Sequence, residues 1–388
     1  MKSEWITIRA ADFIEFNPRL SIKKGTIATK VAMDKLQPFT KKIPLTEQAV
    51  FTGGSKFCNG DTIMARITPC LENGKTAFVD MLEDSEIAFG STEFIVMRAR
   101  PGISDPQFVY YLATNPAFRD VAIKSMVGTS GRQRVQQGVL NELELTVPPL
   151  EEQETIGKIL ALFDHKIALN NRISDNLQQQ AFAIFDGLLS NNHSSECCLS
   201  QIAILNPKRI LRKNEPARCI DMSQLPTSGS FPNGWEIKPY NGGMRFSNGD
   251  TLLARITPCL ENGKTAYIDF LNANEVAFGS TEYVVIASQG EYPPEFFYCL
   301  ARYPAFVDYA VKNMNGSSGR QRVSAETIGN YVLPVLTDDE LSEFQSTVPS
   351  LFKTMKNNSI ENMSLAQLRD TLLPKLMSGE IDVSNIHF

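Results

Sequence analysis

Residues 57–77 read FCNGDTIMARITPCLENGKTA, and residues 246–266 read FSNGDTLLARITPCLENGKTA, at an offset of 189. Shorter matches continue at nearly the same offset: FGSTE at 89–93 and 278–282, and GTSGRQRV at 128–135, which returns as GSSGRQRV at 316–323. A period near half the chain is too long for a solenoid, whose units run about 20 to 50 residues. The 388 residues therefore contain a duplicated domain, and we expect approximate two-fold symmetry between the copies.

One segment in each copy escapes this match. Residues 20–50 and 209–239 share only scattered positions, such as Met33 with Met222. A common frame therefore carries a variable segment in each copy, and we use that name for these two ranges.

Each copy ends in a long amphipathic helix. Residues 150–190 place apolar side chains at steps of three and four, and residues 337–377 repeat the pattern. A similar polar sequence interrupts both apolar stripes, Asn170-Asn171-Arg172-Ile173 in the first and Asn357-Asn358-Ser359-Ile360 in the second. Such polar residues suggest a site that fixes the register of two packed helices. Equivalent stripes favour packing of the helices on each other over packing of each helix on its own domain. At about 1.5 Å per residue such helices reach roughly 57 Å.

The remaining sequence reads as mixed α and β. Thr62 to Ile67 and Phe94 to Met97 are expected strands, and Pro106 to Met126 and Pro294 to Met314 are expected helices packed on them. The predicted class is α+β, with two pseudo-two-fold-related mixed α/β domains separated by two long antiparallel coiled-coil helices. The predicted boundaries are 1–149 for the first domain, 150–192 for the first helix, 193–336 for the second domain, and 337–388 for the second helix and tail.

The net charge of −5 is unevenly distributed. Residues 150–190 carry a net charge of −3 and residues 337–382 a net charge of −4, which leaves about +2 for the rest of the chain. The helices therefore hold the acidity, and the globular domains can approach a polyanion.

The motifs do not favour catalysis by this chain. Gly74-Lys75-Thr76 resembles the end of a phosphate-binding loop, but Pro69 occupies the first glycine position and lacks an N–H donor. Signatures of base methylation and of nucleophilic triads are missing. The seven cysteines and three histidines show no metal-ligand spacing. We expect no catalytic residues, no cofactor and no metal in this chain.

The loops with Gly-Arg-Gln-Arg are the sharpest polar feature, since seven of their eight residues are kept in both copies. Their arginines lie in Gly/Ser-rich text without nearby acidic residues, a setting in which guanidinium groups can reach phosphate oxygens. An ordinary surface turn is the alternative for a single copy. The candidate DNA-contacting residues are Lys75, Arg132, Gln133 and Arg134 in the first copy, and Lys264, Arg320, Gln321 and Arg322 in the second.

Nothing in the sequence indicates a membrane protein. No apolar run reaches the 18 or so residues that span a bilayer, and the text after Met1 lacks the apolar stretch of a signal peptide. The expected compartment is the cytoplasm.

Taken together, these motifs resemble the DNA-specificity (S) subunit of type I restriction-modification systems. The resemblance covers essentially the whole chain: Asn-Pro-Arg/Lys near each domain start, Asn-Gly-Asp-Thr, Gly-Ser-Ser-Gly-Arg-Gln-Arg, Val147-Pro148-Pro149-Leu150-Glu151-Glu152-Gln153, and a closing segment from Leu373 to Ile381. The second copy departs from the Pro-Pro-Leu-Glu-Glu-Gln text, where it reads Leu333-Pro334-Val335-Leu336-Thr337-Asp338-Asp339-Glu340.

The resemblance implies two target-recognition domains that each read one half of a bipartite double-stranded DNA target. It also implies that the helices dock two methyltransferase (M) subunits, and that motor-endonuclease (R) subunits join the complex. S-adenosylmethionine and ATP with Mg would then act in those partner subunits. Because the candidate residues are common to both copies, base choice more plausibly comes from the variable segments. Two alternatives stay open: a duplicated protein-binding scaffold, and a tandem nucleotide-binding enzyme.

Overall fold

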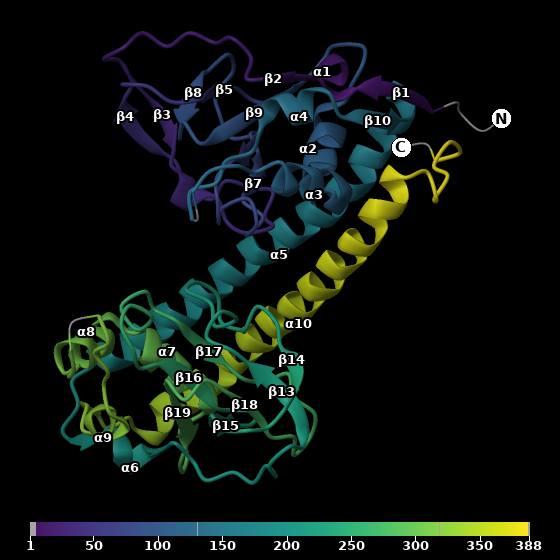
Figure 1. The fold of residues 1–388 in the computed structure, drawn as a ribbon. Helices are drawn as coiled ribbons and strands as arrows, with labels where there is room; N and C mark the ends of the chain where they lie inside the picture. The colour runs from purple at the N-terminus through teal and green to yellow at the C-terminus, as the bar shows by residue number, and fades with distance from the viewer. Residues whose placement is uncertain (1–4, 130, 318, 387–388) are drawn as a thin grey trace. The chain divides into compact units, whose positions relative to one another are not determined.

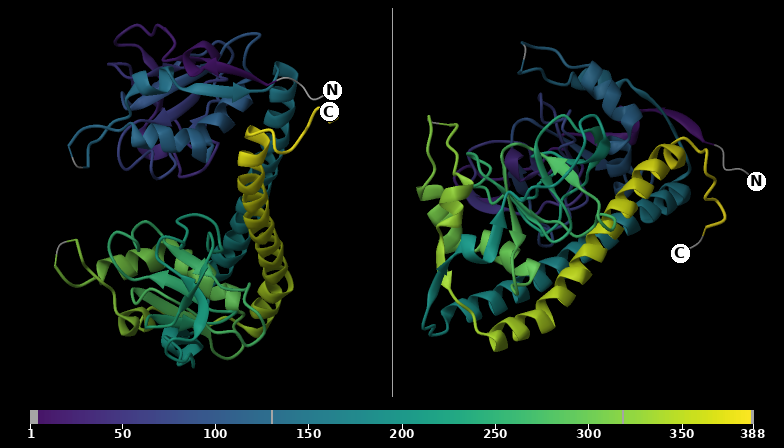
Figure 2. Two further views of the ribbon diagram at one scale, coloured as in Figure 1. Left: turned by 45° about the vertical axis from the view of Figure 1, so that its right-hand side comes forward. Right: turned by 90° about the horizontal axis from the view of Figure 1, so that it is seen from below.

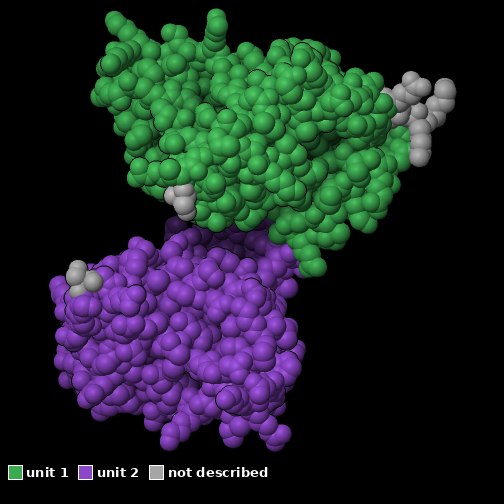
Figure 3. Space-filling view, viewed as in Figure 1, with its two compact units in different colours: residues 1–165, 365–388 green, residues 166–364 purple. Residues whose placement is uncertain are grey.

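The computed structural model describes residues 5–129, 131–317 and 319–386. The chain divides into two compact units: unit 1 comprises residues 1–165 and 365–388, and unit 2 comprises residues 166–364 (Figure 3). Two long helices, α5 (Leu150–Ser190) and α10 (Asp338–Met377), run from one unit into the other (Figure 1). Each unit therefore contains a segment of both helices.

The described residues of unit 1 form three sheets. A two-stranded sheet pairs β1 (Ile6–Arg9) with β10 (Glu144–Val147). A four-stranded antiparallel sheet has the order β2 (Ile14–Phe16), β9 (Phe94–Ala99), β6 (Thr62–Ala65), β7 (Thr76–Phe78). A second four-stranded sheet has the order β4 (Glu47–Val50), β3 (Ile27–Val31), β8 (Ala88–Gly90), β5 (Lys56–Phe57), in which β3 and β8 are parallel.

The helices of unit 1 besides the long pair are short. They are α1 (Ala10–Phe13), the 3-10 helix η1 (Met33–Lys35), α2 (Pro106–Thr114), α3 (Pro116–Lys124) and α4 (Gln137–Asn141).

Unit 2 repeats this topology sheet for sheet. Its small sheet pairs β11 (Glu196–Cys198) with β20 (Val332–Pro334). Its four-stranded sheets are β12 (Ala203–Leu205), β19 (Tyr283–Ser288), β16 (Thr251–Ala254), β17 (Thr265–Tyr267), and β14 (Glu236–Pro239), β13 (Pro216–Ile220), β18 (Ala277–Gly279), β15 (Met244–Phe246). Its short helices are α6 (Leu199–Ile202), α7 (Pro294–Arg302), α8 (Pro304–Lys312) and α9 (Ala325–Gly329).

The sheet that contains β6 and β9 is buried on both faces. Ile63 and Val96 lie in a core shared with the β3–β8 sheet, whereas Met64 and Met97 lie in a core shared with α2, α5 and α10. Successive side chains of a strand point to opposite faces, so each strand feeds two cores at once. The repeated text at residues 57–77 supplies β6 and β7, at the centre of this arrangement.

The predicted α+β class and the pair of long helices are confirmed, while two local predictions need correction. β6 ends at Ala65 rather than Ile67, and β9 continues to Ala99 rather than ending at Met97.

Each segment predicted as one helix after the central strands forms two. Between α2 and α3, Asn115 has an extended ψ of 131°, and its side-chain oxygen accepts a hydrogen bond from Ala117 N–H at 3.3 Å. Proline disfavours helical geometry in the residue before it, so Pro116 ends α2 and opens α3. Tyr303 and Pro304 divide α7 from α8 in the same position. The predictions of single helices were wrong because the spacing of apolar residues does not show that a proline interrupts the helix.

The two long helices begin in different ways. In unit 1 the buried Gln153 donates to the carbonyl oxygens of Pro148 (2.9 Å) and Ile103 (3.1 Å) and accepts from Asp105 N–H (3.1 Å). In unit 2 Thr337 and Glu340 form a reciprocal capping box, and the backbone N–H of Thr337 helps lower the pKa of Glu340 to about 2. The second copy lacks the Pro-Pro-Leu-Glu-Glu-Gln sequence. Its long helix therefore begins with a capping box, where that of the first copy begins with the hydrogen bonds of Gln153.

Figure 2 shows the ribbons of α5 and α10 side by side, and within unit 2 a layer of polar side chains lies between them. Asn170 is fully buried, and its Nδ2 donates to Glu361 Oε2 (2.6 Å) and to Asn362 Oδ1 (2.9 Å). Asn358 Nδ2 donates to Ser174 Oγ at 3.2 Å. Residue numbers rise along one helix as they fall along the other, so the pair is antiparallel. Asn170 contacts Asn362 on the opposite helix, and Asn358 contacts Ser174 in the same way. Asn170 and Asn358 are 188 positions apart, and so are Ser174 and Asn362. Asn170 therefore corresponds in structure to Asn358, although the sequence alignment pairs it with Asn357.

We expect Asn170→Leu to raise the free energy of unfolding by about 1 kcal/mol and to loosen the register of the helix pair. The substitution replaces a buried amide whose Oδ1 finds no hydrogen-bond partner among the described residues with an apolar group, and a buried polar layer specifies register at a cost in stability. Urea unfolding and light scattering would measure both effects, with the exposed Asn357→Leu as the control. A clear loss of stability in a single monomeric species would contradict the register role.

Candidate nucleic-acid interface

Three repeated segments, far apart in the chain, meet at one place in unit 1. Gln133 N–H donates to Thr68 Oγ1 (2.8 Å), and Gln133 O accepts from Thr68 N–H (3.0 Å). Arg66 O accepts from Val135 N–H (2.8 Å), and Arg66 N–H donates to Glu93 O (2.9 Å). The loop of residues 127–135, closed by a bridge from Val127 to Arg134, is thus docked on the turn after β6 and on the start of β9.

Unit 2 repeats these contacts. The corresponding hydrogen bonds run from Gln321 N–H to Thr257 Oγ1 (3.0 Å), from Thr257 N–H to Gln321 O (3.1 Å), from Val323 N–H to Arg255 O (3.0 Å), and from Arg255 N–H to Glu282 O (3.0 Å). The repetition of this text in both copies has a structural cause, because each segment holds the others in place. Ser130 and Ser318 of the loops lie outside the described residues.

The second arginine of each loop is held by an acidic residue. Arg134 binds Glu93 through Nε (2.9 Å) and Nη2 (2.7 Å), and Arg322 binds Glu282 in the same two-pronged way (2.9 and 2.7 Å). The hydrogen bonds from Arg322 lower the pKa of the Glu282 carboxyl. The expectation that these arginines have no acidic residue nearby was therefore wrong, since Glu93 and Glu282 are some 40 positions distant in sequence.

The two candidate lysines also serve the fold. Lys75 Nζ donates to the carbonyl oxygen of Met33 at 2.9 Å, and Lys264 Nζ donates to that of Met222 at 2.6 Å. Each lysine ties the turn of the repeated text to the variable segment of its own unit. A phosphate-binding role for Gly74-Lys75-Thr76 would require Lys75 to leave this contact.

Arg132 and Arg320 remain available to a ligand. Both side chains are exposed, and no acceptor for either guanidinium group is found among the described residues. Gln133 and Gln321 are half-buried and use their backbone groups for docking. Of the eight candidates, the first arginine of each loop is thus the one that the fold does not employ.

Three further pairs of basic residues, which the sequence did not single out as candidate DNA contacts, align at an offset of 189. All are exposed: Arg19 with Lys208, Lys23 with Arg212, and Lys24 with Lys213. The last two pairs precede β3 and β13, in turns where Gly25 (φ 89°) and Asn214 (φ 65°) take the left-handed conformation. An alignment of the two copies by side-chain charge, instead of by residue identity, would have found these pairs. Most neighbouring residues differ between the copies, but both positions of each pair are basic.

The described residues offer little to other chemistries. Within them, no group of three or more His, Cys, Asp or Glu side chains could hold a metal ion. Their helices include none that is long and apolar enough to cross a membrane.

Comparison with known proteins identifies a family domain in the first half of the chain. The family model for the type I restriction modification DNA specificity domain matches residues 3–179. The chain is 24% identical over 405 residues to the type I restriction enzyme HindI specificity subunit of Haemophilus influenzae, a match that covers 83% of this chain and 86% of that protein. Residues 3–179 therefore belong to the type I restriction modification DNA specificity domain family. The repeated sequence carries the same motifs into the second half of the chain.

Two further likenesses agree with this assignment. The EcoAI specificity subunit of Escherichia coli is 32% identical over 134 residues, which is 34% of this chain and 21% of that protein. The crystal structure of a type I system S subunit from M. genitalium superposes with a TM-score of 0.53 at 17% identity over 96% of both chains, which shows a shared fold. The relatives are specificity subunits, which are the non-catalytic subunits of their enzymes.

The ion pair in unit 2 predicts a pH dependence of stability. Arg322 lowers the pKa of Glu282, so the pair stabilises the fold above the ordinary carboxyl pKa of 4.5, and this contribution is lost as the pH falls through the lowered value. The stability advantage of wild type over Glu282→Gln should therefore be present at pH 7 and vanish toward pH 3 in urea titrations. The exposed Glu291→Gln serves as the control, and a pH-independent difference would contradict the ion pair.

Proposed function

We propose that each unit of this specificity subunit reads one half of a bipartite double-stranded DNA target, and that the long helices set the separation of the two halves. The observation that carries the proposal is the duplication itself. Two copies of one fold present the same exposed basic positions, and both are built on the same pair of continuous helices. A bipartite sequence is the target that two similar readers on a common support fit best.

The proposal divides the work within each unit. Arg132 and Arg320, with the exposed basic residues ahead of β3 and β13, supply contacts to phosphate, which carry affinity rather than sequence information. The variable segments supply base choice, because they differ between the copies while the docked loops do not. Gln133, Arg134, Gln321, Arg322, Lys75 and Lys264 then act mainly by holding those loops and segments in place.

The helices offer surface to partner proteins. Leu162, Leu169 and Ile173 of α5, and Ile360 and Leu368 of α10, are between 39% and 57% exposed. We propose that two methyltransferase subunits bind there, that motor-endonuclease subunits join them, and that S-adenosylmethionine, ATP and Mg act in those subunits. The complex would work in the cytoplasm, where it meets the DNA.

The test of the proposal is to copurify the chain with the methyltransferase subunit of its own system and to sequence the adenines that the complex methylates. A bipartite site with a fixed gap is the expected result. A continuous site would overturn the two-reader proposal, and a complex without sequence-dependent methylation would favour the protein-binding scaffold.

Arg132→Ala and Arg320→Ala should each weaken DNA binding and reduce the salt dependence of the binding constant. The slope of log K against log salt should fall by about 0.9 for each phosphate that the variant no longer neutralises. Titrations at several salt concentrations measure this slope, and Arg172→Ala, which removes an exposed arginine from α5, is the matched control. Unchanged slopes in both loop variants would exclude the phosphate contacts.

A further inference from the structure

Unit 1 contains a buried lysine that unit 2 lacks. Lys41, in the variable segment, is 9% exposed, and its Nζ donates to Tyr111 Oη at 3.0 Å and to Gln107 Oε1. It also lies 4.5 Å from the ring centre of Tyr111 and 5.1 Å from that of Tyr110. The ammonium group is thus enclosed by the side chains of α2.

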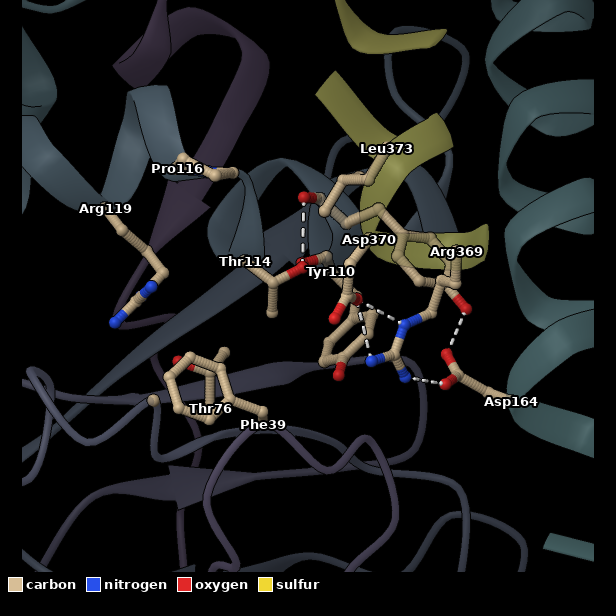
Figure 4. A pocket seen from close by; sticks show the side chains of 12 residues that line it. Phe39, Thr76, Tyr110, Thr114, Pro116, Arg119, Asp164, Arg369, Asp370 and Leu373 are labelled. Atoms are coloured by element: carbon tan, nitrogen blue, oxygen red, sulfur yellow. Dashed lines mark hydrogen bonds and ion pairs between the residues drawn. The ribbon is translucent and has the colours of Figure 1, made fainter. Parts of the chain in front are cut away.

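The contacts continue from Lys41 to both long helices. Tyr111 Oη donates to Asp164 Oδ2 of α5 at 2.5 Å, and Asp164 Oδ1 forms an ion pair with Arg369 Nη1 of α10 at 2.5 Å. Arg369 also binds Asp370 at 2.8 Å. Figure 4 shows Asp164, Arg369 and Asp370 on the wall of a cavity of about 180 Å³, with Arg369 between the two carboxylates. We call the connected set of Lys41, Tyr111, Asp164 and Arg369 the ionic clamp.

The clamp holds the variable segment. The carbonyl oxygen of Lys41 accepts from Phe78 N–H of β7 at 2.9 Å, so its backbone is fixed to the sheet while its side chain reaches the helix contacts. A segment that presents particular side chains to DNA does so more precisely when its backbone and its side chains are both held in place.

The second copy replaces every member of the clamp with an uncharged residue. Ile156 and Leu160 of α5 are fully buried, as are Phe344 and Val348 of α10, so these helices align at an offset of 188. The helices α2 and α7 align at the same offset. The counterparts of Lys41, Tyr111, Asp164 and Arg369 are then Ser230, Cys299, Phe352 and Ala181. Phe352 packs edge to face on Tyr267 (5.3 Å) and Tyr298 (5.5 Å), and Ser230 Oγ donates to Gln178 Oε1 of α5 at 2.8 Å. Unit 2 therefore makes this junction with apolar contacts and a neutral hydrogen bond in place of the charged groups.

We propose that Lys41 is a positioning residue that fixes the variable segment of unit 1 on the long helices through the ionic clamp, so that discrimination at the first half-site, and not at the second, depends on it. This inference rests on the proposed function, in which each unit reads one half-site. A buried ion pair contributes geometry more reliably than stability. Lys41 therefore matters for the accuracy of reading more than for the persistence of the fold.

The experiment compares Lys41→Met with Ser230→Ala in the purified complex with methyltransferase. Methylation rates are measured on duplexes that carry single base changes in either half-site. Lys41→Met should lower discrimination at the first half-site about tenfold and leave the second within twofold, and its melting temperature should stay at or above that of wild type, since Asp164 keeps Arg369 as its partner. Ser230→Ala, which removes a neutral hydrogen bond to Gln178 of α5 in unit 2, should leave discrimination at the first half-site unchanged.

Two further measurements test the charge. Asp164→Asn should lower discrimination at the first half-site to the same degree, and the double variant should be no worse than either single variant, because both residues act through the same clamp, connected by Tyr111. Lys41→Arg, which keeps the charge, should restore part of the discrimination. Additive effects, or equal effects at both half-sites, would overturn the proposal. A wild-type complex without a bipartite site would instead refute the proposed function.

Alkaline pH gives an independent readout. Burial lowers the pKa of Lys41 to about 8, against the opposing charge of Asp164. Discrimination at the first half-site should therefore fall between pH 7 and 9 in wild type and stay flat in Lys41→Met, and equal profiles in both proteins would overturn the clamp. The titratable and charged groups around Lys41 are Asp164 on α5, Arg369 and Asp370 on α10, Tyr110 and Tyr111 on α2, Asp105 before α2, and Asp80 after β7.

Discussion

Each unit closes its apolar core with segments of both long helices, and the rest of the structure depends on this packing. In unit 1, Leu160 of α5 and Leu373 of α10 lie in one core with the residues of α2, although more than 200 positions separate them in the sequence. Unit 2 uses Phe185 and Phe344 in the same way. Burial of this extent is the main favourable term in folding, so the helices are part of each unit rather than a linker between them.

The duplicated text divides into parts that serve the fold and parts that are left for a ligand. Glu93 with Arg134, and Glu282 with Arg322, hold the loops against the sheets, and Lys75 and Lys264 hold the variable segments. Repetition in two copies is therefore not by itself a sign of DNA contact. Exposure combined with a missing internal partner is more informative, and it singles out Arg132 and Arg320 within the described part of the chain.

The differences between the copies are as informative as the likenesses. Unit 1 connects its variable segment to the helices through charged groups, and unit 2 makes the same connection with an aromatic side chain and a neutral hydrogen bond. Apolar contact is tolerant of small displacements, whereas hydrogen-bonded ions prefer one geometry. One architecture can thus hold two different readers with different precision, and the acidic character of the helices leaves the exposed cations on the domains for DNA.

The sequence by itself determined the duplication, the α+β class and the two long helices, because identity at a fixed offset and apolar periodicity are properties of the chain alone. It did not show where Pro116 and Pro304 break the helices after the central strands. Only the tertiary structure decided which basic residues are available, since Glu93 approaches Arg134 and the Met33 carbonyl approaches Lys75 across some 40 residues of sequence. The physical reason is that a charge is satisfied by its neighbours in space, and a pattern of residues records only its neighbours in the chain.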